Sequence, residues 1–502
     1  MKGCLILVFS IGLFISRVKA ADIFSPGIIW EPETALTVPP YYNTLESNGD
    51  QSRVVVTSDG QVHITWTSFR PATPRVPQIY YKRFIPGVGW GEDTCISADL
   101  AGTVQCELPA IACDSQDNLH LVWAEYRAIW NIWYKMRSSF GVWDSVSSSI
   151  SPGYAHKFDP VIACSPNGNV HVAWKEYDGT KRLVYREKIG DVWGPTFTVE
   201  SLLPHYRGIY YISIAPGPDN SIHFSWHIET DSAPPRVFYL YRCRNSEGIW
   251  SEPETIPFAY SMVVNPYTGE PHIFSGTTII RHAYKSGRLW AIEAVTNPIP
   301  DCWQYFPDCV FTPDTVLHVV WSNRWYLSGV YYHQLRHTSK RPGGQWDTID
   351  IVTPDSTKDR YLSYPSLANG GRSLFDHHLY LVYDISDSNQ VPQVYFVHGQ
   401  PMPSGIRWEK GILPEVRTGS NLFVRGTRIG YEVAQTGLVR LAAYSALGRR
   451  VRVITQGRQE KGRYCVVWDG RDEKGKPEPA GVYYCRLETA DKCVTAKMLL
   501  IR

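Results

Sequence analysis

Short apolar blocks alternate with polar turns through most of the chain, and one block recurs. It carries histidine at its second position and an aromatic residue at its fifth, as in VHITW ending at Trp66 and VHVAW ending at Trp174. Further copies are LHLVW, IHFSW and LHVVW, and two weaker copies are PHIFS and LYLVY. Runs this short that are apolar at successive positions predict strands buried on both faces. Their recurrence about every 50 residues predicts a repeat architecture.

The segments around each copy recur as well. A strand such as PAIAC or PVIAC comes before it, an aromatic strand such as IWYK or LVYR follows, and a glycine-tryptophan turn such as FGVW or GDVW opens a fourth strand. One four-stranded sheet cannot bury both of its faces, so such units stack around an axis. We therefore predict an all-β fold containing a seven-bladed β-propeller. Six or eight blades are alternatives, because GIIW at 27–30 and GIRW at 405–408 compete for the closing strand.

The repeated histidines and tryptophans are interpreted as scaffold. Equivalent positions fan out around a ring, so these histidines cannot meet around a metal ion, whose nitrogen and oxygen ligands lie about 2 Å away. We expect each ring nitrogen to bond the adjoining turn or strand, and we expect no metal and no cofactor. The repeat positions are His63, His120, His171, His223, His272, His318, Trp66, Trp123, Trp174, Trp226 and Trp321.

The chain is predicted to have three parts. Residues 1–20 resemble a secretory signal peptide, with Lys2 before an apolar stretch and a small-residue cleavage pattern at Ala20. Residues 21–412 hold the repeats, and residues 413–502 form a separate C-terminal domain. No later stretch is apolar for long enough to span a bilayer. We expect an exported protein, secreted or at a bacterial cell surface.

The tryptophan turns resemble those of sialidase-like (BNR-like) propellers, whose marker is the Asp-box S-x-D-x-G-x-T-W. The nearest forms here are SSFGVW, ending at Trp143, and NSEGIW, ending at Trp250, which keep the glycine and tryptophan but not the aspartate and threonine. The resemblance implies a propeller over roughly residues 27–412. It is weak for activity, because glycine and tryptophan in a turn are folding devices.

The C-terminal domain shows about seven short strands with polar turns, the pattern of a small β-sandwich. Its motifs are YSALGRRV, WDGRDEKG and GVYY, carried by Tyr444, Gly448, Arg449, Val451, Trp468, Asp469, Gly470, Gly475, Gly481, Val482 and Tyr483. It resembles the immunoglobulin-like domain of flagellar hook-capping proteins and the C-terminal sorting domain of the type IX secretion system. The resemblance implies export or surface attachment, with the secretion machinery or an envelope component as partner.

Charge and cysteine content limit the function classes. The chain has 50 Lys or Arg against 48 Asp or Glu, so it lacks the concentrated basic face of a nucleic-acid binder. Eleven cysteines in 502 residues are too few for a disulfide framework. Candidate disulfides are Cys302 with Cys309, and Cys465 with Cys485 or Cys493. Cys113 and Cys164 occupy equivalent repeat positions and are expected to be free thiols.

The binding residues are expected in loops at one rim of the propeller. Two sets of loops should meet there, those after each His/Trp strand and those joining one blade to the next. Aromatic rings can stack on sugars, and arginines can pair with carboxylates through two hydrogen bonds. The candidates are Arg70, Glu125, Arg127, Trp130, Glu176, Asp178, His205, Arg207, Trp303, Arg324, Trp325 and Arg360. Lys175 and His227 belong to the same group of loops.

Two functions follow from this pattern. The first is a monomeric binding or scaffold module that recognises an extracellular glycan or protein. The second is a glycan-cleaving enzyme of sialidase type, an exo-glycosidase. That enzyme would need three converging arginines, for which Arg70, Arg127, Arg207, Arg324 and Arg360 are available, and a tyrosine nucleophile with a glutamate partner. No catalytic residue can be named from the sequence, and binding is the favoured function.

Overall fold

The computed structural model describes most of the chain from Ile28 onward. The described residues are 28–31, 33–39, 41–45, 52–69, 76–97, 104–327, 330–353, 357–358, 360–370, 378–387, 390–401, 416–418, 422–423, 427–433, 435–445, 449–489 and 493–500. They form strands and no helix. The predicted signal peptide 1–20 lies outside them, and no described helix is long and apolar enough to cross a membrane.

Seven antiparallel sheets, numbered here in chain order, precede the C-terminal domain in the described part of the chain. Sheet 1 contains β3 (Tyr42–Thr44), β4 (Val54–Val56), β5 (Val62–Phe69), β6 (Gln78–Ile85), β7 (Gly89–Trp90) and β8 (Thr94–Cys95). Sheet 2 contains β9 (Gln105–Cys113), β10 (Leu119–Tyr126), β11 (Trp130–Arg137) and β12 (Ser148–Ser149). Sheet 3 contains β13 (His156–Cys164), β14 (Val170–Tyr177), β15 (Lys181–Ile189), β16 (Val192–Trp193) and β17 (Phe197–Ser201).

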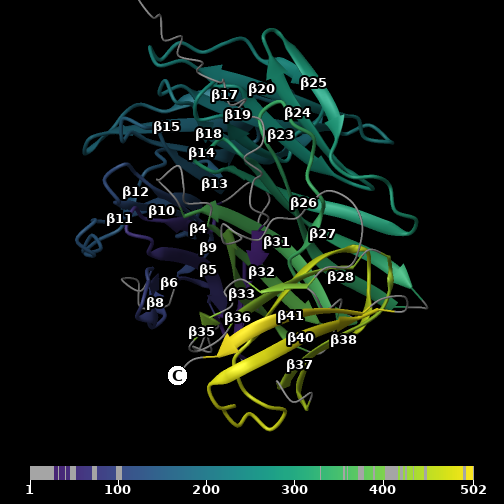
Figure 1. Cartoon of the computed structure of the whole chain (residues 1–502). Coiled ribbons are helices and arrows are strands. Elements are labelled where there is room, and N and C mark those ends of the chain that lie inside the picture. Colours follow the sequence, from purple (N-terminus) through teal and green to yellow (C-terminus); the bar gives the residue numbers. More distant parts are fainter. Residues whose placement is uncertain are drawn as a thin grey trace, which may run out of the picture.

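The other four sheets repeat the same order of strands (Figure 1). Sheet 4 contains β18 (Tyr206–Pro216), β19 (Ile222–Thr230), β20 (Val237–Arg244) and β21 (Glu254–Ile256). Sheet 5 contains β22 (Ser261–Val264), β23 (Pro271–Gly276), β24 (Ile280–Ser286) and β25 (Leu289–Ala294). Sheet 6 contains β26 (Cys302–Phe311), β27 (Leu317–Leu327), β28 (Val330–Lys340), β29 (Asp350–Ile351) and β30 (Thr357–Lys358). Sheet 7 contains β31 (Arg360–Asn369), β32 (Leu379–Asp387), β33 (Gln390–Pro401), β1 (Ile28–Trp30) and β2 (Thr34–Ala35).

The sheets form a closed ring, which makes this region a β-propeller. The inner strands β4, β9, β13, β18, β22, β26 and β31 each contact the inner strand of the next sheet, and β31 contacts β4. Closure uses the N-terminal segment, because β1 pairs antiparallel with β33 and Ile28 lies opposite Pro401. The sequence favoured this strand for closure. Its competitor, GIRW at 405–408, lies outside the described residues.

The repeated residues hold each sheet internally. His171 joins Tyr185 Oη on the next strand through Nδ1 at 2.7 Å and Ser165 Oγ in the preceding turn through Nε2 at 2.9 Å. His63, His120 and His223 contact tyrosine hydroxyls in the same way, whereas His272 and His318 contact a second histidine. The five repeat tryptophans are at most 1% exposed. These contacts explain why the two residue types recur.

The turn before each repeat histidine imposes a backbone requirement. Gly168 has φ of 85°, and the equivalent Asp117 and Asn220 have φ of 65°. Only glycine adopts this region without strain, and asparagine and aspartate tolerate it better than other residues do. The glycine, asparagine and aspartate residues in the turns SPNGN and DSQDN are therefore explained by the backbone conformation of the turn rather than by ligand binding.

The cysteine expectations are partly wrong. Cys302 and Cys309 are both buried and form no disulfide with each other. They lie near opposite ends of β26, and a strand rises about 3.3 Å per residue. Cys485 is also free, which excludes its predicted pairing, and the side chains of Cys465 and Cys493 are outside the described residues. Cys113 and Cys164 form no disulfide, as expected.

The C-terminal domain contains two sheets. One is β34 (Val416–Thr418), β36 (Thr427–Val433) and β39 (Gly462–Trp468). The other is β35 (Leu422–Phe423), β41 (Cys493–Leu500), β40 (Gly481–Glu488), β37 (Gly437–Ser445) and β38 (Arg450–Gln459). Their shared core includes buried Tyr431, Trp468 and Tyr483. The predicted domain boundary at 412/413 falls in the undescribed segment between Pro401 and Val416.

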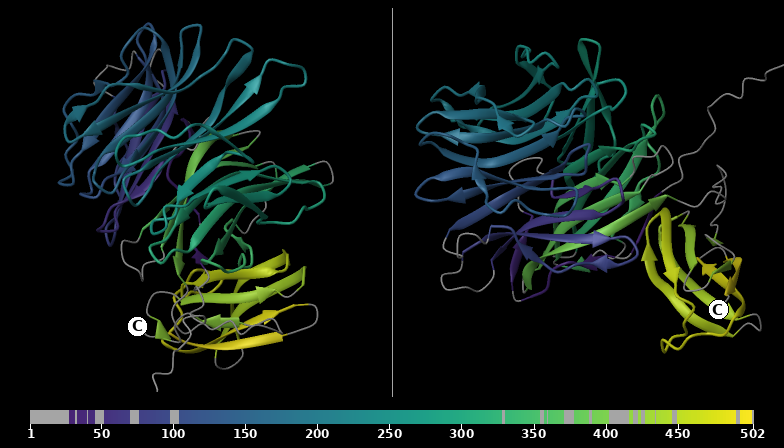
Figure 2. Two further views of the ribbon diagram at one scale, coloured as in Figure 1. Left: turned by 90° about the horizontal axis from the view of Figure 1, so that it is seen from above. Right: turned by 90° about the vertical axis from the view of Figure 1, so that its left-hand side faces the viewer.

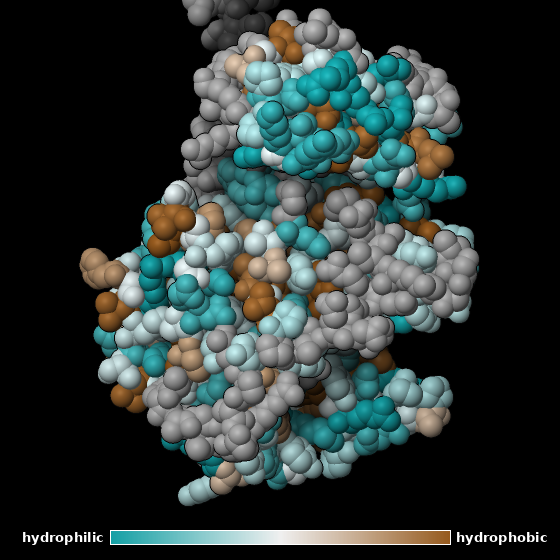
Figure 3. All heavy atoms as spheres, turned by 90° about the horizontal axis from the view of Figure 1, so that it is seen from below, coloured by the Kyte–Doolittle hydropathy of each residue, from teal (hydrophilic) through white to brown (hydrophobic). Residues whose placement is uncertain are grey.

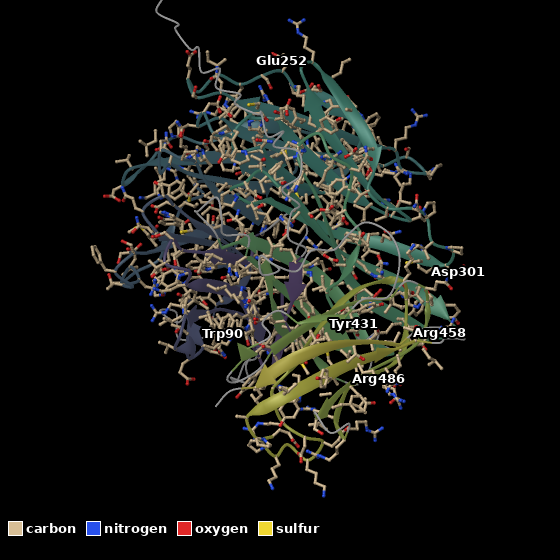
Figure 4. All side chains as sticks on the ribbon, in the orientation of Figure 1. Trp90, Glu252, Asp301, Tyr431, Arg458 and Arg486 are labelled. Carbon is tan, nitrogen blue, oxygen red and sulfur yellow. The ribbon has the colours of Figure 1, made fainter. Side chains whose placement is uncertain are left out.

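The C-terminal domain lies at one edge of the propeller, beside sheet 6 (Figure 2). Ile351 of β29 packs against the core of the domain, and Arg336 Nη2 lies 3.0 Å from Glu460 Oε2. Arg458 and Arg486 extend from β38 and β40 into solvent (Figure 4). On the face of the molecule in Figure 3, hydrophobic residues are scattered among hydrophilic ones.

Candidate functional site

Five inner strands carry a β-bulge at an equivalent position, opposite the repeat aromatic residue. In β13, for example, the pairing shifts between Phe158 and Val161. The first residue of each bulge has positive φ, although none is glycine: Leu108 (56°), Asp159 (50°), Tyr211 (46°), Phe306 (54°) and Tyr364 (50°). A bulge redirects a side chain, and strained backbone of this kind gathers at functional sites. These positions therefore mark the inner ring as the candidate site.

Four aromatic rings follow one another along this inner ring, from sheets 4, 5, 6 and 7. The ring centroids of Tyr211 and Tyr260 are 4.8 Å apart, those of Tyr260 and Phe306 are 6.0 Å apart, and those of Phe306 and Tyr364 are 4.9 Å apart. All four side chains are partly exposed. We call these four residues the aromatic arc. It joins aromatic rings from four separate segments of the chain.

Charged groups occupy other parts of the same ring, and we call Arg53, Asp159, Lys175 and Asp384 the charged cluster. Lys175 Nζ lies 2.5 Å from Asp159 Oδ2 in sheet 3. Arg53 precedes β4 in sheet 1 and is 1% exposed; burial lowers its pKa to about 9, although the charges of Asp384 and Asp159 raise it. Asp384 in sheet 7 accepts hydrogen bonds from the Thr44 hydroxyl and a backbone amide, each at 2.9 Å.

His227 lies where the arc meets the charged cluster. Its ring centroid is 5.2 Å from that of Tyr210 and 4.9 Å from that of Tyr211, and Lys175 Nζ lies 5.3 Å from the Tyr210 ring. Burial and the charge of Lys175 lower the pKa of His227 to about 4. The imidazole is therefore neutral near pH 7. Burial also raises the pKa of Tyr211, so its hydroxyl stays protonated there.

The structure places the two predicted sets of loops at the same edge of the sheets. His156, which begins β13, lies opposite Tyr177 near the end of β14, and Cys302 lies opposite Trp325 in sheet 6. The predicted rim residues are distributed along this edge over several sheets. Most of them already have partners within their own sheet.

In sheet 2, the predicted residues contact one another or the next sheet. Glu125 is fully buried and accepts a hydrogen bond of 2.7 Å from Arg127 Nε, while burial raises the pKa of its carboxyl group. The Arg127 guanidinium lies 4.1 Å from the centroid of the Trp133 ring. Trp130 packs against Phe158 with ring centroids 6.0 Å apart. Glu125 is thus an internal anchor for Arg127 rather than a rim group.

In sheets 3 and 4, the predicted residues lie at the surface. Glu176 and Asp178 both bind the guanidinium of Arg182, with the shortest contacts at 3.0 and 2.5 Å. His205 and Arg207 are exposed. None of these side chains reaches the aromatic arc through a contact among the described residues.

In sheet 6, Trp303 and Arg324 lie directly opposite each other on β26 and β27. Trp325 is the next residue on β27, so its side chain points to the other face, where it stacks on Tyr332 with centroids 5.9 Å apart. Arg70 lies outside the described residues, and Arg360 begins β31 but its side chain is not described.

Of the five arginines available to a sialidase, the structure describes the side chains of Arg127, Arg207 and Arg324, in sheets 2, 4 and 6. Arg127 contacts Glu125 and Trp133, and Arg324 contacts Tyr331 and Tyr361. No group of three or more His, Cys, Asp or Glu in the described part of the chain could hold a metal ion.

Sequence reasoning missed the arc and most of the charged cluster. The signal was the residue before the proline in the first strand of a repeat, as in LPAIAC, DPVIAC and YPSLA. That residue varies as Leu108, Asp159 and Tyr364 while its neighbours repeat. A variable position inside a regular repeat indicates a function for that position rather than a role in the scaffold.

Comparison with solved structures finds similar chains of several activities. A polysaccharide lyase of family 25, an ulvan lyase, is 12% identical with a TM-score of 0.46 and covers 70% of this chain and 93% of its own. A fungal alcohol oxidase in complex with copper is 11% identical with a TM-score of 0.45, covering 94% and 99%. An α-L-arabinanase of Penicillium chrysogenum is 14% identical with a TM-score of 0.39, covering 74% and 97%. Likeness at this level assigns no activity.

The search among curated proteins found no match. A family model matches the C-terminal domain, over residues 426–492, and is described as the FlgD Ig-like domain. This match fits the two-sheet fold of β34–β41 and agrees with the resemblance drawn from YSALGRRV and WDGRDEKG. The chain is therefore a β-propeller followed by an Ig-like domain similar to that of FlgD.

Proposed function

We propose that the propeller is a glycan-binding module and that the aromatic arc holds the glycan. The observation that carries the proposal is the series of four partly exposed rings along the inner strands. A sugar ring presents an apolar face of C–H groups, which gains from contact with aromatic faces in water. Rings spaced 4.8 to 6.0 Å apart suit an extended chain of sugars better than one small ligand.

We further propose that the protein is exported and that the Ig-like domain attaches it at the cell surface or directs its secretion. The similarity to the FlgD Ig-like domain and the pattern of residues 1–20 support this. A truncation ending at Pro414 should leave the protein inside the cell or release it from the surface. Normal location of the truncated chain would argue against the role.

A glycan array tests the binding proposal directly. The full chain and a variant carrying Tyr260→Ala and Phe306→Ala should be compared, with circular dichroism to check folding. We expect the full chain to bind at least one class of glycan and the variant to lose that binding. Capture of a protein ligand with no glycan binding would favour the scaffold function instead.

A second candidate is a glycan-cleaving enzyme. Its support is that two carboxylates, Asp159 and Asp384, both act on the buried Arg53 across the inner ring. Glycosidases use a pair of carboxylates on either side of the scissile bond. Turnover of the bound glycan that is abolished by Asp159→Asn or Asp384→Asn would establish this function, and a lack of turnover would favour binding alone.

A further inference from the structure

We propose that Arg324 in sheet 6 binds the carboxylate or sulfate of an acidic sugar, which makes the ligand an acidic polysaccharide. This inference rests on the proposed glycan-binding function and adds the chemical class of the ligand. It concerns a position at the edge of sheet 6, separate from the four residues of the aromatic arc.

The position is built from a row of side chains across three strands. Trp303, Arg324 and His333 lie opposite one another on β26, β27 and β28, so their side chains share one face of the sheet. The Arg324 guanidinium lies 3.9 Å from the centroid of the Tyr331 ring and 4.9 Å from that of Tyr361. Nη1 donates a hydrogen bond of 2.5 Å to Tyr361 Oη. The two rings therefore fix the plane of the guanidinium.

No carboxylate among the described residues pairs with Arg324, in contrast to three other arginines of the propeller. Arg127, Arg182 and Arg244 each bind a glutamate. Arg324 is half-buried, and its Nε has no hydrogen-bond acceptor. A cation that is partly removed from water and lacks a counter-ion is costly, and a bound anion would offset that cost. The guanidinium has five donors and can hold a carboxylate or sulfate with two parallel bonds.

His333, the neighbour of Arg324 on β28, adds no second charge to the site. His333 is fully buried, neither ring nitrogen has a hydrogen-bond partner, and its ring centroid is 4.3 Å from that of Tyr361. Burial and the charge of Arg324 lower the pKa of His333 to about 4. The imidazole is therefore neutral near pH 7 and leaves the single positive charge of Arg324 for the ligand.

Exposed aromatic side chains surround this charge and suit a sugar. Trp303 is 43% exposed, Tyr326 48%, Tyr331 38% and Tyr361 39%. Exposed rings of this size beside an arginine are typical of binding positions, where they supply contact area at little entropic cost. The arginine selects the anionic group, and the rings receive the rest of the sugar.

The test compares three polymers: dextran, which is neutral, dextran sulfate, which adds sulfate to the same backbone, and polygalacturonate, which carries carboxylates. Calorimetric titration at 150 mM salt should show binding to at least one acidic polymer. Arg324→Gln should weaken that binding roughly 10- to 100-fold, and Arg324→Lys, which keeps the charge without the fork, should weaken it less. Arg281→Gln removes an exposed arginine of β24 and is the matched control, with no change expected.

Binding of the acidic polymers that Arg324→Gln leaves unchanged would overturn the inference, and so would preference for dextran. The variant Tyr260→Ala/Phe306→Ala separates this result from failure of the glycan-binding proposal. If that variant loses binding and Arg324→Gln does not, the arc is the site and Arg324 does not bind the acidic group. Failure of the unaltered protein to bind any glycan would overturn both.

Discussion

The charged cluster and the aromatic arc occupy the same inner ring but differ in how their side chains are satisfied. Arg53, Asp159 and Asp384 are buried and held by opposite charges or hydrogen bonds, whereas the arc residues are partly exposed and held by contacts between rings. Buried paired charges hold a structure in one arrangement, and partly exposed rings remain available for a ligand. The difference suggests that one group positions the strands and the other meets the ligand.

Acid should destabilise the whole propeller, including the charged cluster and the aromatic arc, and this is the largest effect expected on the free energy of unfolding. The pKa values of His63 and His171 are lowered to about 3 and that of His223 to about 4 by burial, against 6.5 for an exposed histidine. Between pH 6.5 and these lowered pKa values, the unfolded chain binds more protons than the folded chain. The contribution of these histidines to the free energy of unfolding is therefore fully present above pH 6.5 and falls as the pH drops towards 4. Each such histidine should contribute about 1.4 kcal/mol per pH unit. Urea unfolding at pH 7.5, 5.5 and 4.5 measures the slope.

A pair of variants tests whether equivalent histidines of different sheets contribute equally to the pH dependence of the unfolding free energy. His171→Gln in sheet 3 and His223→Gln in sheet 4 should each make the unfolding free energy less dependent on pH. Equal reduction would assign the acid response to the repeated scaffold. An unchanged slope in both variants would contradict the assignment.

Replacement of Arg53 should test the charged cluster separately from the aromatic arc. Arg53→Met removes the buried positive charge that interacts with Asp159 and Asp384, and it should lower the free energy of unfolding by about 3–5 kcal/mol. Combining it with Asp384→Asn should recover part of the loss, because one uncompensated charge disappears. Urea unfolding at pH 7.5 measures both. A loss below about 1 kcal/mol would show that Arg53 does not hold the ring.

Sequence predicted the scaffold well and the site poorly, for physical reasons. The repeat tryptophans and histidines recur because most sheets need the same packing, and four of them use the same histidine–tyrosine contact, so local pattern was enough to predict a propeller. The closing strand β1 could also be predicted, because GIIWEPE at 27–33 resembles the outer-strand segment GIWSEPE at 248–254. These features depend on residues that are close in the sequence or identical between copies.

The inner ring could not be predicted in the same way. Arg53 and Asp384 come together only because sheet 7 closes against sheet 1, and nothing near either residue in the sequence marks the other. The bulges that redirect Asp159 and Tyr211 appear in the sequence only as a variable residue in a regular strand. The predicted rim residues share a sheet edge, but four of the charged ones form local ion pairs: Glu125 with Arg127, and Glu176 and Asp178 with Arg182.

Replacement of arc residues should alter binding more than folding. Tyr260→Ala with Phe306→Ala removes the two middle rings of the arc and should weaken glycan binding by about 2–4 kcal/mol, since buried aromatic contacts dominate such interfaces. The unfolding midpoint should shift less than in Arg53→Met, because both rings are already partly exposed. Equal binding by the variant and the unaltered chain would remove the arc from the site.

The smallest effect is expected from the exposed charges of the rim. Asp178 is exposed and accepts hydrogen bonds from Arg182 and from the Thr180 backbone amide, and the bond from Arg182 is the main cause of its lowered pKa. Because water already solvates both groups, Asp178→Asn should change glycan affinity by about twofold or less. Calorimetric titration beside the arc variant makes the contrast quantitative. A loss from Asp178→Asn as large as that from the arc variant would move the binding site outward, to the loops that follow the His/Trp strands.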